Sequence, residues 1–169
     1  MKLLSRLFRS ADPREQLRPL WHRVVEITRE KRWYAEMGVA DTLEGRFDMI
    51  SAVLALVLLR MEREEKLIEP SVFLTELFVE DMDGQLRESG VGDLVVGKHI
   101  GRLVSSLGGR LGAFRTALAQ DDDAALADAV ARNVNLIEGA DPQAAATGLR
   151  ALAQKLAEVP GEQLLRAGI

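Results

Sequence analysis

Hydrophobic residues recur along this chain mainly at steps of three and four, the spacing that places side chains on one face of an α-helix. The first series follows Asp12 and Pro13, which favour a helix start. It predicts a helix to about Arg32, whose apolar face holds Leu17, Leu20, Trp21, Val24 and Ile27. Gly38 then interrupts the helical pattern.

The second predicted helix is apolar on all sides at its centre, where residues 49–59 read MISAVLALVLL. About 20 apolar residues are needed to cross a bilayer, so this run is too short to span one. A helix that is hydrophobic all round is instead typical of the centre of a helical protein. Asp41 and Glu44 resemble a capping box at its start, and the helix is predicted to continue to about Lys66.

Four more apolar series complete the pattern. After Glu69-Pro70, the third helix presents Leu74, Leu77, Phe78, Met82 and Leu86, and the fourth presents Ile100, Leu103, Val104, Leu107, Leu111, Phe114 and Leu118. An Ala-rich helix follows residues 121–123 to about Glu138, and a last helix runs from Asp141-Pro142 to about Glu158. Without a convincing alternating strand pattern, the sequence predicts an all-α fold, a single compact domain of about six main helices around the central apolar helix 49–59.

The fourth helix has a second face with almost no side chain. Its members recur at steps of four, four, three and four residues, and we call them the glycine stripe: Gly97, Gly101, Ser105, Gly108 and Gly112. Each glycine inside a helix costs about 1 kcal/mol relative to alanine, so close packing is expected to compensate. Two interpretations remain open. Another helix of the same domain packs on the stripe, or a helix of a bound partner does, because small residues let helix backbones approach closely.

The composition is that of a soluble globular protein, with 47% hydrophobic and 28% charged residues. The absence of cysteine excludes disulfides, thiol catalysis and thiolate metal ligands. The formal net charge of −4 is unevenly distributed, because residues 1–34 contain nine Lys or Arg against four acidic residues and the remainder is strongly acidic. An acidic body is repelled by nucleic acid phosphates, so we expect no DNA partner.

Residues 1–11 are predicted to form a separate basic N-terminal segment, flexible or amphipathic, ahead of a helical domain over residues 12–169. An interfacial helix would place the apolar and basic residues on different faces, and the candidates for membrane contact are Lys2, Leu3, Leu4, Arg6, Leu7, Phe8 and Arg9. A disordered start is the alternative, because ten isolated residues rarely hold a helix in water. The segment lacks the features of a secretory signal, so we expect a cytoplasmic protein, peripheral on the cytoplasmic face of the inner membrane where this segment binds lipid.

Residues 80–98, EDMDGQLRESGVGDLVVGK, combine acidic residues, basic residues and glycines at a predicted helix end. The part from Gly92 to Lys98 resembles most of a phosphate-binding loop. Such a loop needs a preceding strand and a Ser or Thr after its lysine, whereas a helix is predicted here and His99 follows the lysine. The sequence therefore argues against a nucleotide site.

A metal site is also disfavoured. Asp81 and Asp83 resemble the start of a calcium loop, but its sixth and twelfth positions hold Leu86 and Gly92, where glycine and glutamate are required. The chain has two histidines, on separate predicted helices, which leaves little material for a zinc site or a Ser-His-Asp triad. We predict no catalytic residue, no metal and no cofactor.

Several motifs occur in one order along the chain. They are Tyr34-Ala-Glu-Met-Gly-Val39, Gly45-Arg-Phe-Asp-Met-Ile50, Asp81-Met-Asp83, Leu86-Arg-Glu88, Gly90-Val-Gly-Asp93, Gly97-Lys98, Gly109-Arg110 and Arg132-Asn133. Together they resemble the ubiquinol-cytochrome c chaperone family. The resemblance implies a non-enzymatic, all-helical assembly factor for the respiratory ubiquinol-cytochrome c reductase that binds newly made cytochrome b. It also implies partners: cytochrome b or another subunit of that complex and, as in mitochondrial relatives, a partner chaperone and the ribosome.

The resemblance and the residue pattern together give a set of candidates for client binding: Arg46, Asp48, Asp81, Asp83, Arg87, Glu88, Val91, Asp93, Leu94, Lys98, Gly101, Gly108 and Gly112. One hypothesis is that the charged members orient residues 90–97 or pair with client charges, while the apolar members touch client surface. The alternative is that Arg87 and Asp93 only hold a helix-loop-helix corner in shape. Two other functions remain as alternatives, an RNA- or ribosome-associated helical module and, less favoured, a small hydrolase.

Overall fold

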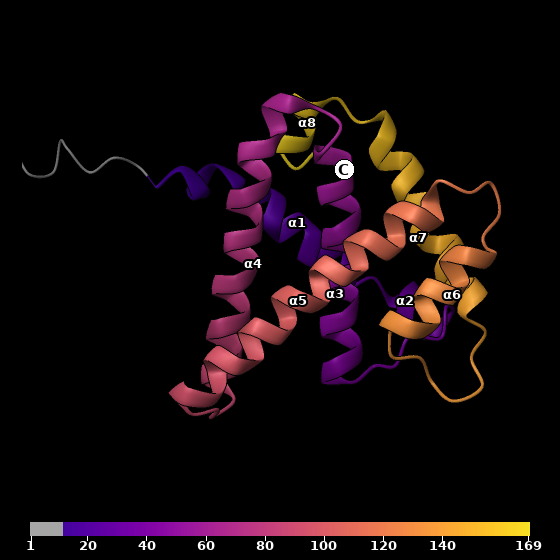
Figure 1. Ribbon diagram of the computed structural model, residues 1–169, viewed down its shortest axis with the longest axis horizontal. Coiled ribbons are helices and arrows are strands. Elements are labelled where there is room, and N and C mark those ends of the chain that lie inside the picture. The colour runs from indigo at the N-terminus through magenta and orange to yellow at the C-terminus, as the bar shows by residue number, and fades with distance from the viewer. Residues whose placement is uncertain (1–11) are drawn as a thin grey trace, which may run out of the picture.

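The central apolar run forms helix α3 (Leu43–Met61), which lies in the middle of the molecule (Figure 1). The computed structural model describes residues 12–169. Every residue from Met49 to Leu58 in α3 is buried, and helices α1, α4, α5 and α7 pack around it. The prediction of a central helix is confirmed, because an element that is apolar on all sides loses its contact with water only when other elements surround it.

The remaining elements are all helical. In chain order they are η2 (Pro13–Leu17), α1 (Arg18–Thr28), α2 (Lys31–Ala35), η3 (Glu65–Leu67), α4 (Ile68–Glu88), α5 (Asp93–Leu118), α6 (Ala124–Asn133), α7 (Pro142–Glu158) and α8 (Gly161–Leu165). Between residues 12 and 169, extended pairing is limited to one isolated antiparallel bridge between Val39 and Leu136. The all-α fold is confirmed, and the six helices of ten or more residues in the described part of the chain agree with the predicted number of main helices.

Helix α1 ends earlier than the predicted helix to Arg32. Its last residue is Thr28, and α2 follows after a short turn. The Trp33 indole Nε1 donates to the carbonyl oxygen of Ile27 at 2.8 Å, and the Tyr34 hydroxyl donates to that of Thr28 at 2.8 Å. These side chains satisfy carbonyls at the end of α1 that lack helical partners. The prediction of one helix to about Arg32 was therefore wrong. The helix ends at Thr28, where side-chain donors from Trp33 and Tyr34 cap it.

The start of α3 also differs from the prediction. Thr42, and not Asp41, is the N-cap, because its side chain accepts a hydrogen bond from the backbone N–H of Gly45 at 3.1 Å. The carboxylate of Asp41 bonds instead to Nε of Arg46 at 2.7 Å. The capping box of Asp41 and Glu44 was wrong by one residue.

Two predicted helix ends were too late. Helix α3 ends at Met61 rather than near Lys66, and α6 ends at Asn133 rather than near Glu138. After α6 the chain becomes extended, and the backbone N–H of Ala40 donates to the carbonyl oxygen of Asn135 at 2.9 Å. By contrast, α7 begins and ends as predicted, with the Asp141 carboxylate accepting from the N–H of Gln143 at 2.9 Å.

Buried arginines join the helices of the core. Arg110 of α5 is 5% exposed; its guanidinium donates to the carbonyl oxygen of Asn133 and pairs with Asp48 of α3. Arg60 of α3 donates to the carbonyl oxygen of Val159 at 2.7 Å and pairs with Glu64. Buried charges persist only when they are paired and hydrogen-bonded, so these contacts fix α5 and the C-terminal part of the chain against α3.

Helices α4 and α5 have a more open arrangement than the rest. They join at the lower left of Figure 1, through residues 89–92, and diverge from there, with α3 behind the space between them. Helix α4 packs on α1 and η2, whereas α5 crosses α3 and continues to α6. In the described part of the chain, no helix is both long and apolar enough to cross a membrane.

Candidate functional site

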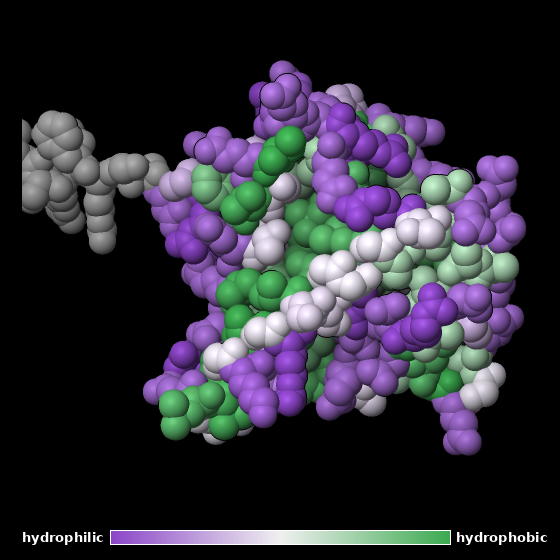
Figure 2. All heavy atoms as spheres, in the orientation of Figure 1, coloured by the Kyte–Doolittle hydropathy of each residue, from purple (hydrophilic) through white to green (hydrophobic). Residues whose placement is uncertain are grey.

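A groove of about 650 Å³ lies between α4 and α5, with α3 as its floor. Its apolar lining comes from Leu58 of α3, Val72 and Val79 of α4, and Val104 and Leu111 of α5. Figure 2 shows this region as a hydrophobic hollow in a surface that is otherwise largely hydrophilic on this face. The groove exists because α4 and α5 diverge. Part of the apolar flank of each helix therefore faces water instead of packing against the other helix.

Several groove side chains are unusually exposed for their type. Val72 is 53% and Val104 42% exposed. Single exposed apolar residues are ordinary, but an apolar hollow with a polar border is typical of a surface that binds another molecule. Sequence reasoning missed Val72 and Val79, because it considered one apolar face of α4 and these residues lie on its flank.

The border of the groove is charged. Four carboxylates lie on it, from Glu62, Glu76, Glu80 and Asp83, together with the guanidinium of Arg14. Arg14 bonds to Glu80 at 3.2 Å. Glu62 is paired with Arg115, Asp83 with Arg87 and Glu80 also with Arg18, so Glu76 is the border carboxylate without an ion-pair partner among residues 12–169. The border is thus a polar rim of largely paired charges around an apolar lining.

The glycine stripe lies next to the groove on α5. All five members are exposed, and a β-carbon added at any of the four glycines would meet no atom within 4 Å. The interpretation that another helix of the same domain packs on the stripe is therefore wrong for residues 12–169. Val104 lies three residues after Gly101 and four before Gly108, so groove and stripe are adjacent on α5. Figure 2 shows a pale band along α5 beside the hydrophobic hollow.

The corner between α4 and α5 is held by one arginine. Arg87 pairs with Asp83 across one turn of α4, as its spacing predicts, and also with Asp93 at the first turn of α5. Hydrogen bonds to Asp83 and then to Asp93 raise the pKa of Arg87 above its ordinary value. Gly90 has a φ of 85°, a left-handed conformation that favours glycine at this turn. Beside the corner, Leu94 is 97% exposed and Val95 about half exposed.

The other predicted client-binding residues are not all in one place. Asp48 lies away from the groove, with its carboxylate bonded to Arg110 and to the backbone and side-chain nitrogens of Asn135. Arg46 lies at a second recess. Around the corner, Asp81 accepts from Gln85 at 3.3 Å, Val91 is partly buried, and Glu88 and Lys98 are exposed. The membrane-contact candidates between Lys2 and Arg9 lie outside the described residues.

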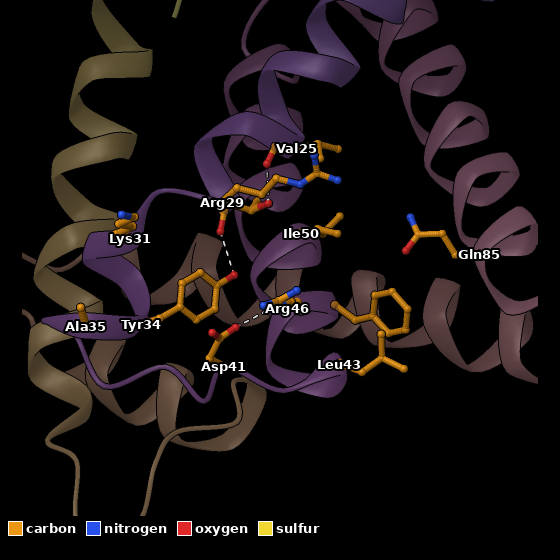
Figure 3. Close-up of a pocket in the computed structure, with 12 residues that line it drawn as sticks. Val25, Arg29, Lys31, Tyr34, Ala35, Asp41, Leu43, Arg46, Ile50 and Gln85 are labelled. Carbon is orange, nitrogen blue, oxygen red and sulfur yellow. Dashed lines mark hydrogen bonds and ion pairs between the residues drawn. The ribbon is translucent and has the colours of Figure 1, made fainter. Parts of the chain in front are cut away.

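The second recess, of about 720 Å³, lies between the end of α1, α2 and the start of α3 (Figure 3). The Tyr34 hydroxyl in it donates to the carbonyl oxygen of Thr28, and burial raises the pKa of Tyr34, so the hydroxyl stays protonated at neutral pH. Arg46 pairs with Asp41 at its border, and Arg29 lies nearby. In residues 12–169 no group of three His, Asp or Glu side chains is arranged to hold a metal ion.

Comparisons with known proteins agree with this architecture. The chain is similar to a crystal structure of the Cbp3 homolog from Brucella abortus, with 31% sequence identity and a TM-score of 0.80 over 99% of this chain and 95% of that one. No curated protein matches the chain significantly. The family model for ubiquinol-cytochrome C chaperone matches residues 35–169, which include α3 and both helices of the groove. This chain therefore belongs to the ubiquinol-cytochrome c chaperone family.

Proposed function

We propose that this chaperone holds an apolar helix of newly made cytochrome b, in the groove and against the glycine stripe, during assembly of the ubiquinol-cytochrome c reductase. The observation that carries the proposal is an exposed apolar groove beside a helix face without side chains. Family membership supports a chaperone role, and the name of the family supports the choice of complex. The role requires no catalysis and no cofactor.

The two parts of the surface suit an apolar helix in different ways. The groove buries side chains of the client, and each fully buried Leu or Phe contributes about 1.5–3 kcal/mol. The stripe allows the client backbone to approach α5 closely, as small residues do between membrane helices. Glu76 on the border can pair with a basic residue, and basic residues flank membrane helices on their cytoplasmic side.

A groove variant with a matched control tests this proposal. Val104→Asp places a charge in the groove, whereas Ile137→Asp places the same charge on another exposed apolar residue, 53% exposed and outside the groove. Tagged copies of both are purified from cells, and cytochrome b is measured relative to other membrane proteins. We expect Val104→Asp to lose at least about tenfold of the enrichment, since burying a charge in an apolar contact is costly, and Ile137→Asp to keep it. Equal enrichment with both variants would count against the groove.

The corner is proposed to present the apolar tip of α5 to the client. Arg87 joins both helices there, and Leu94 extends into water beside it. The variant Asp93→Ala distinguishes direct contact with the client from a structural role at the corner. Loss of cytochrome b capture at an unchanged melting temperature supports direct contact, and parallel loss of both supports a structural role.

The location of the protein is a further part of the proposal. We propose peripheral contact with the cytoplasmic face of the inner membrane through the segment from Lys2 to Arg9, where a client helix is inserted. Deleting residues 2–10 is expected to abolish binding to anionic vesicles. Unchanged vesicle binding after the deletion would refute this contact.

An RNA- or ribosome-associated role remains the alternative from another class. The apolar lining of the groove disfavours phosphate there. Binding to RNA that falls steeply with added salt would support this alternative over the client role.

A further inference from the structure

We propose that the groove has an occupant within its own chain, the basic apolar segment of residues 2–9. The docking of this segment does not depend on which external molecule binds in the groove. Its consequence, competition between this segment and a client helix, rests on the proposed function.

The first argument is where the described chain begins. Asp12 caps η2, which packs against α4, and the Arg14 guanidinium bonds to Glu80 of α4. Arg14 itself lines the groove. Residues 1–11 are therefore attached to the protein at the border of the groove and not at a remote surface.

The second argument is length. The groove follows α4 from Val72 to Asp83, which corresponds to about 16 Å of helix. The eight residues 2–9 reach about 26 Å in an extended conformation, at about 3.3 Å per residue, and span about 12 Å as a helix. In an extended conformation the segment is thus long enough to lie along the whole groove, and as a helix it covers about three quarters of it.

The third argument is complementarity. The groove has an apolar lining and four carboxylates on its border. Residues 2–9 offer four apolar side chains and three cations, in the order Lys2, Leu3, Leu4, Arg6, Leu7, Phe8 and Arg9. Among residues 12–169, Glu76 on the border has no ion-pair partner, whereas Glu62, Glu80 and Asp83 are paired with arginines. The groove and the segment therefore match in hydrophobicity, and Glu76 offers one carboxylate to a cation of the segment.

Covalent attachment makes a weak contact sufficient. A short flexible linker gives the attached segment an effective concentration in the millimolar range. A segment of about ten residues, too short for tight binding on its own, can then occupy the groove in the free protein. A longer client helix would displace it by burying more apolar surface.

The chain has no cysteine, so pairs of introduced cysteines report on the contact directly. The test pair is Leu7→Cys with Val104→Cys, on the α5 wall of the groove. The control pair is Leu7→Cys with His22→Cys, on an exposed part of α1 that does not line the groove. Disulfide formation is followed in the full-length protein without any client.

We expect the test pair to cross-link at least about tenfold faster than the control pair, because docking raises the local concentration of the thiol introduced by Leu7→Cys only near the groove. Adding K2E, R6E and R9E to the test pair should reduce its rate to that of the control. Equal rates for the two pairs, or a test rate that the charge reversals leave unchanged, would refute the docking. Docking with no effect of Val104→Asp on cytochrome b capture would instead refute the proposed function alone.

Discussion

Glycines in the core are closely surrounded by other atoms, whereas the glycines on α5 are open to solvent. A β-carbon at Gly148 of α7 would lie 2.6 Å from the sulfur of Met37 and 2.9 Å from the ring of Trp33, and one at Gly45 would overlap the carbonyl oxygen of Ala40. On α5, the same addition at Gly101 or Gly108 meets nothing within 4 Å. The core glycines are required by contacts within the domain, whereas the cost of the α5 glycines is offset by no contact in residues 12–169. A second molecule is the physical reason we propose for them.

The arginines differ in a parallel way. Arg110 is enclosed among α3, α5 and the end of α6, and its donors reach Asp48 and Asn133. Arg87 at the corner is about half exposed and bonds two carboxylates that also face water. A pair in water contributes little, whereas removing one partner of a buried pair leaves an uncompensated charge. The two regions should therefore respond very differently to the same substitution.

The largest effect is expected at Arg110. Arg110→Ala leaves the carboxylate of Asp48 without its guanidinium and the carbonyl of Asn133 without its donor. We expect the free energy of unfolding to fall by about 3–5 kcal/mol. Urea denaturation measures this change, and a loss below about 1 kcal/mol would contradict the assignment of Arg110 as a core ion pair.

A smaller loss is expected at Gly148. Gly148→Ala forces a methyl group against Met37 and Trp33, and the Trp33 ring is fully buried. Overpacking of a core costs about 1–3 kcal/mol, which outweighs the gain in helix propensity. The melting temperature should fall, and an increase would show that the surroundings of Gly148 adjust freely.

The sign should reverse at Gly101. Gly101→Ala adds a methyl group that meets no atom of residues 12–169, so the helix propensity of alanine should raise the free energy of unfolding by about 0.5–1 kcal/mol. The same denaturation experiment checks this value. A loss of stability would reveal a contact on the stripe and weaken the comparison with Gly148.

The smallest effect is expected at the corner. Arg87→Ala removes pairs with Asp83 and Asp93 that are exposed to water. Exposed pairs contribute about 0.2–1 kcal/mol, and this contribution should shrink further at high salt. Denaturation at low and high salt gives both numbers, and a salt-independent loss above about 2 kcal/mol would contradict the account.

The sequence predicted an element correctly where the local pattern of residues allows one structure. Residues 49–59 are apolar on all sides and could only form a central helix, and Asp141-Pro142 marked the start of α7 correctly. It did not predict the end of α1, because the Trp33 and Tyr34 donors that cap α1 reach it only in the folded chain. Periodicity placed the glycines on one face of α5 but could not tell what lies opposite that face. The groove was missed for the same reason, since it depends on the divergence of α4 and α5.

We propose that the glycine stripe has almost no side chains so that a client helix can approach α5 closely. The most direct measurement compares Gly108→Leu with Gly109→Leu, at the next residue of α5, which is also exposed and equally open to an added β-carbon but lies about 100° around the helix axis, on the side of the stripe away from Val104. Tagged copies with unchanged melting temperatures are purified from cells, and co-purified cytochrome b is quantified. We predict that Gly108→Leu loses at least about tenfold of the cytochrome b, because the added side chain blocks close approach, and that Gly109→Leu retains it. Equal recovery with both variants would contradict the claim.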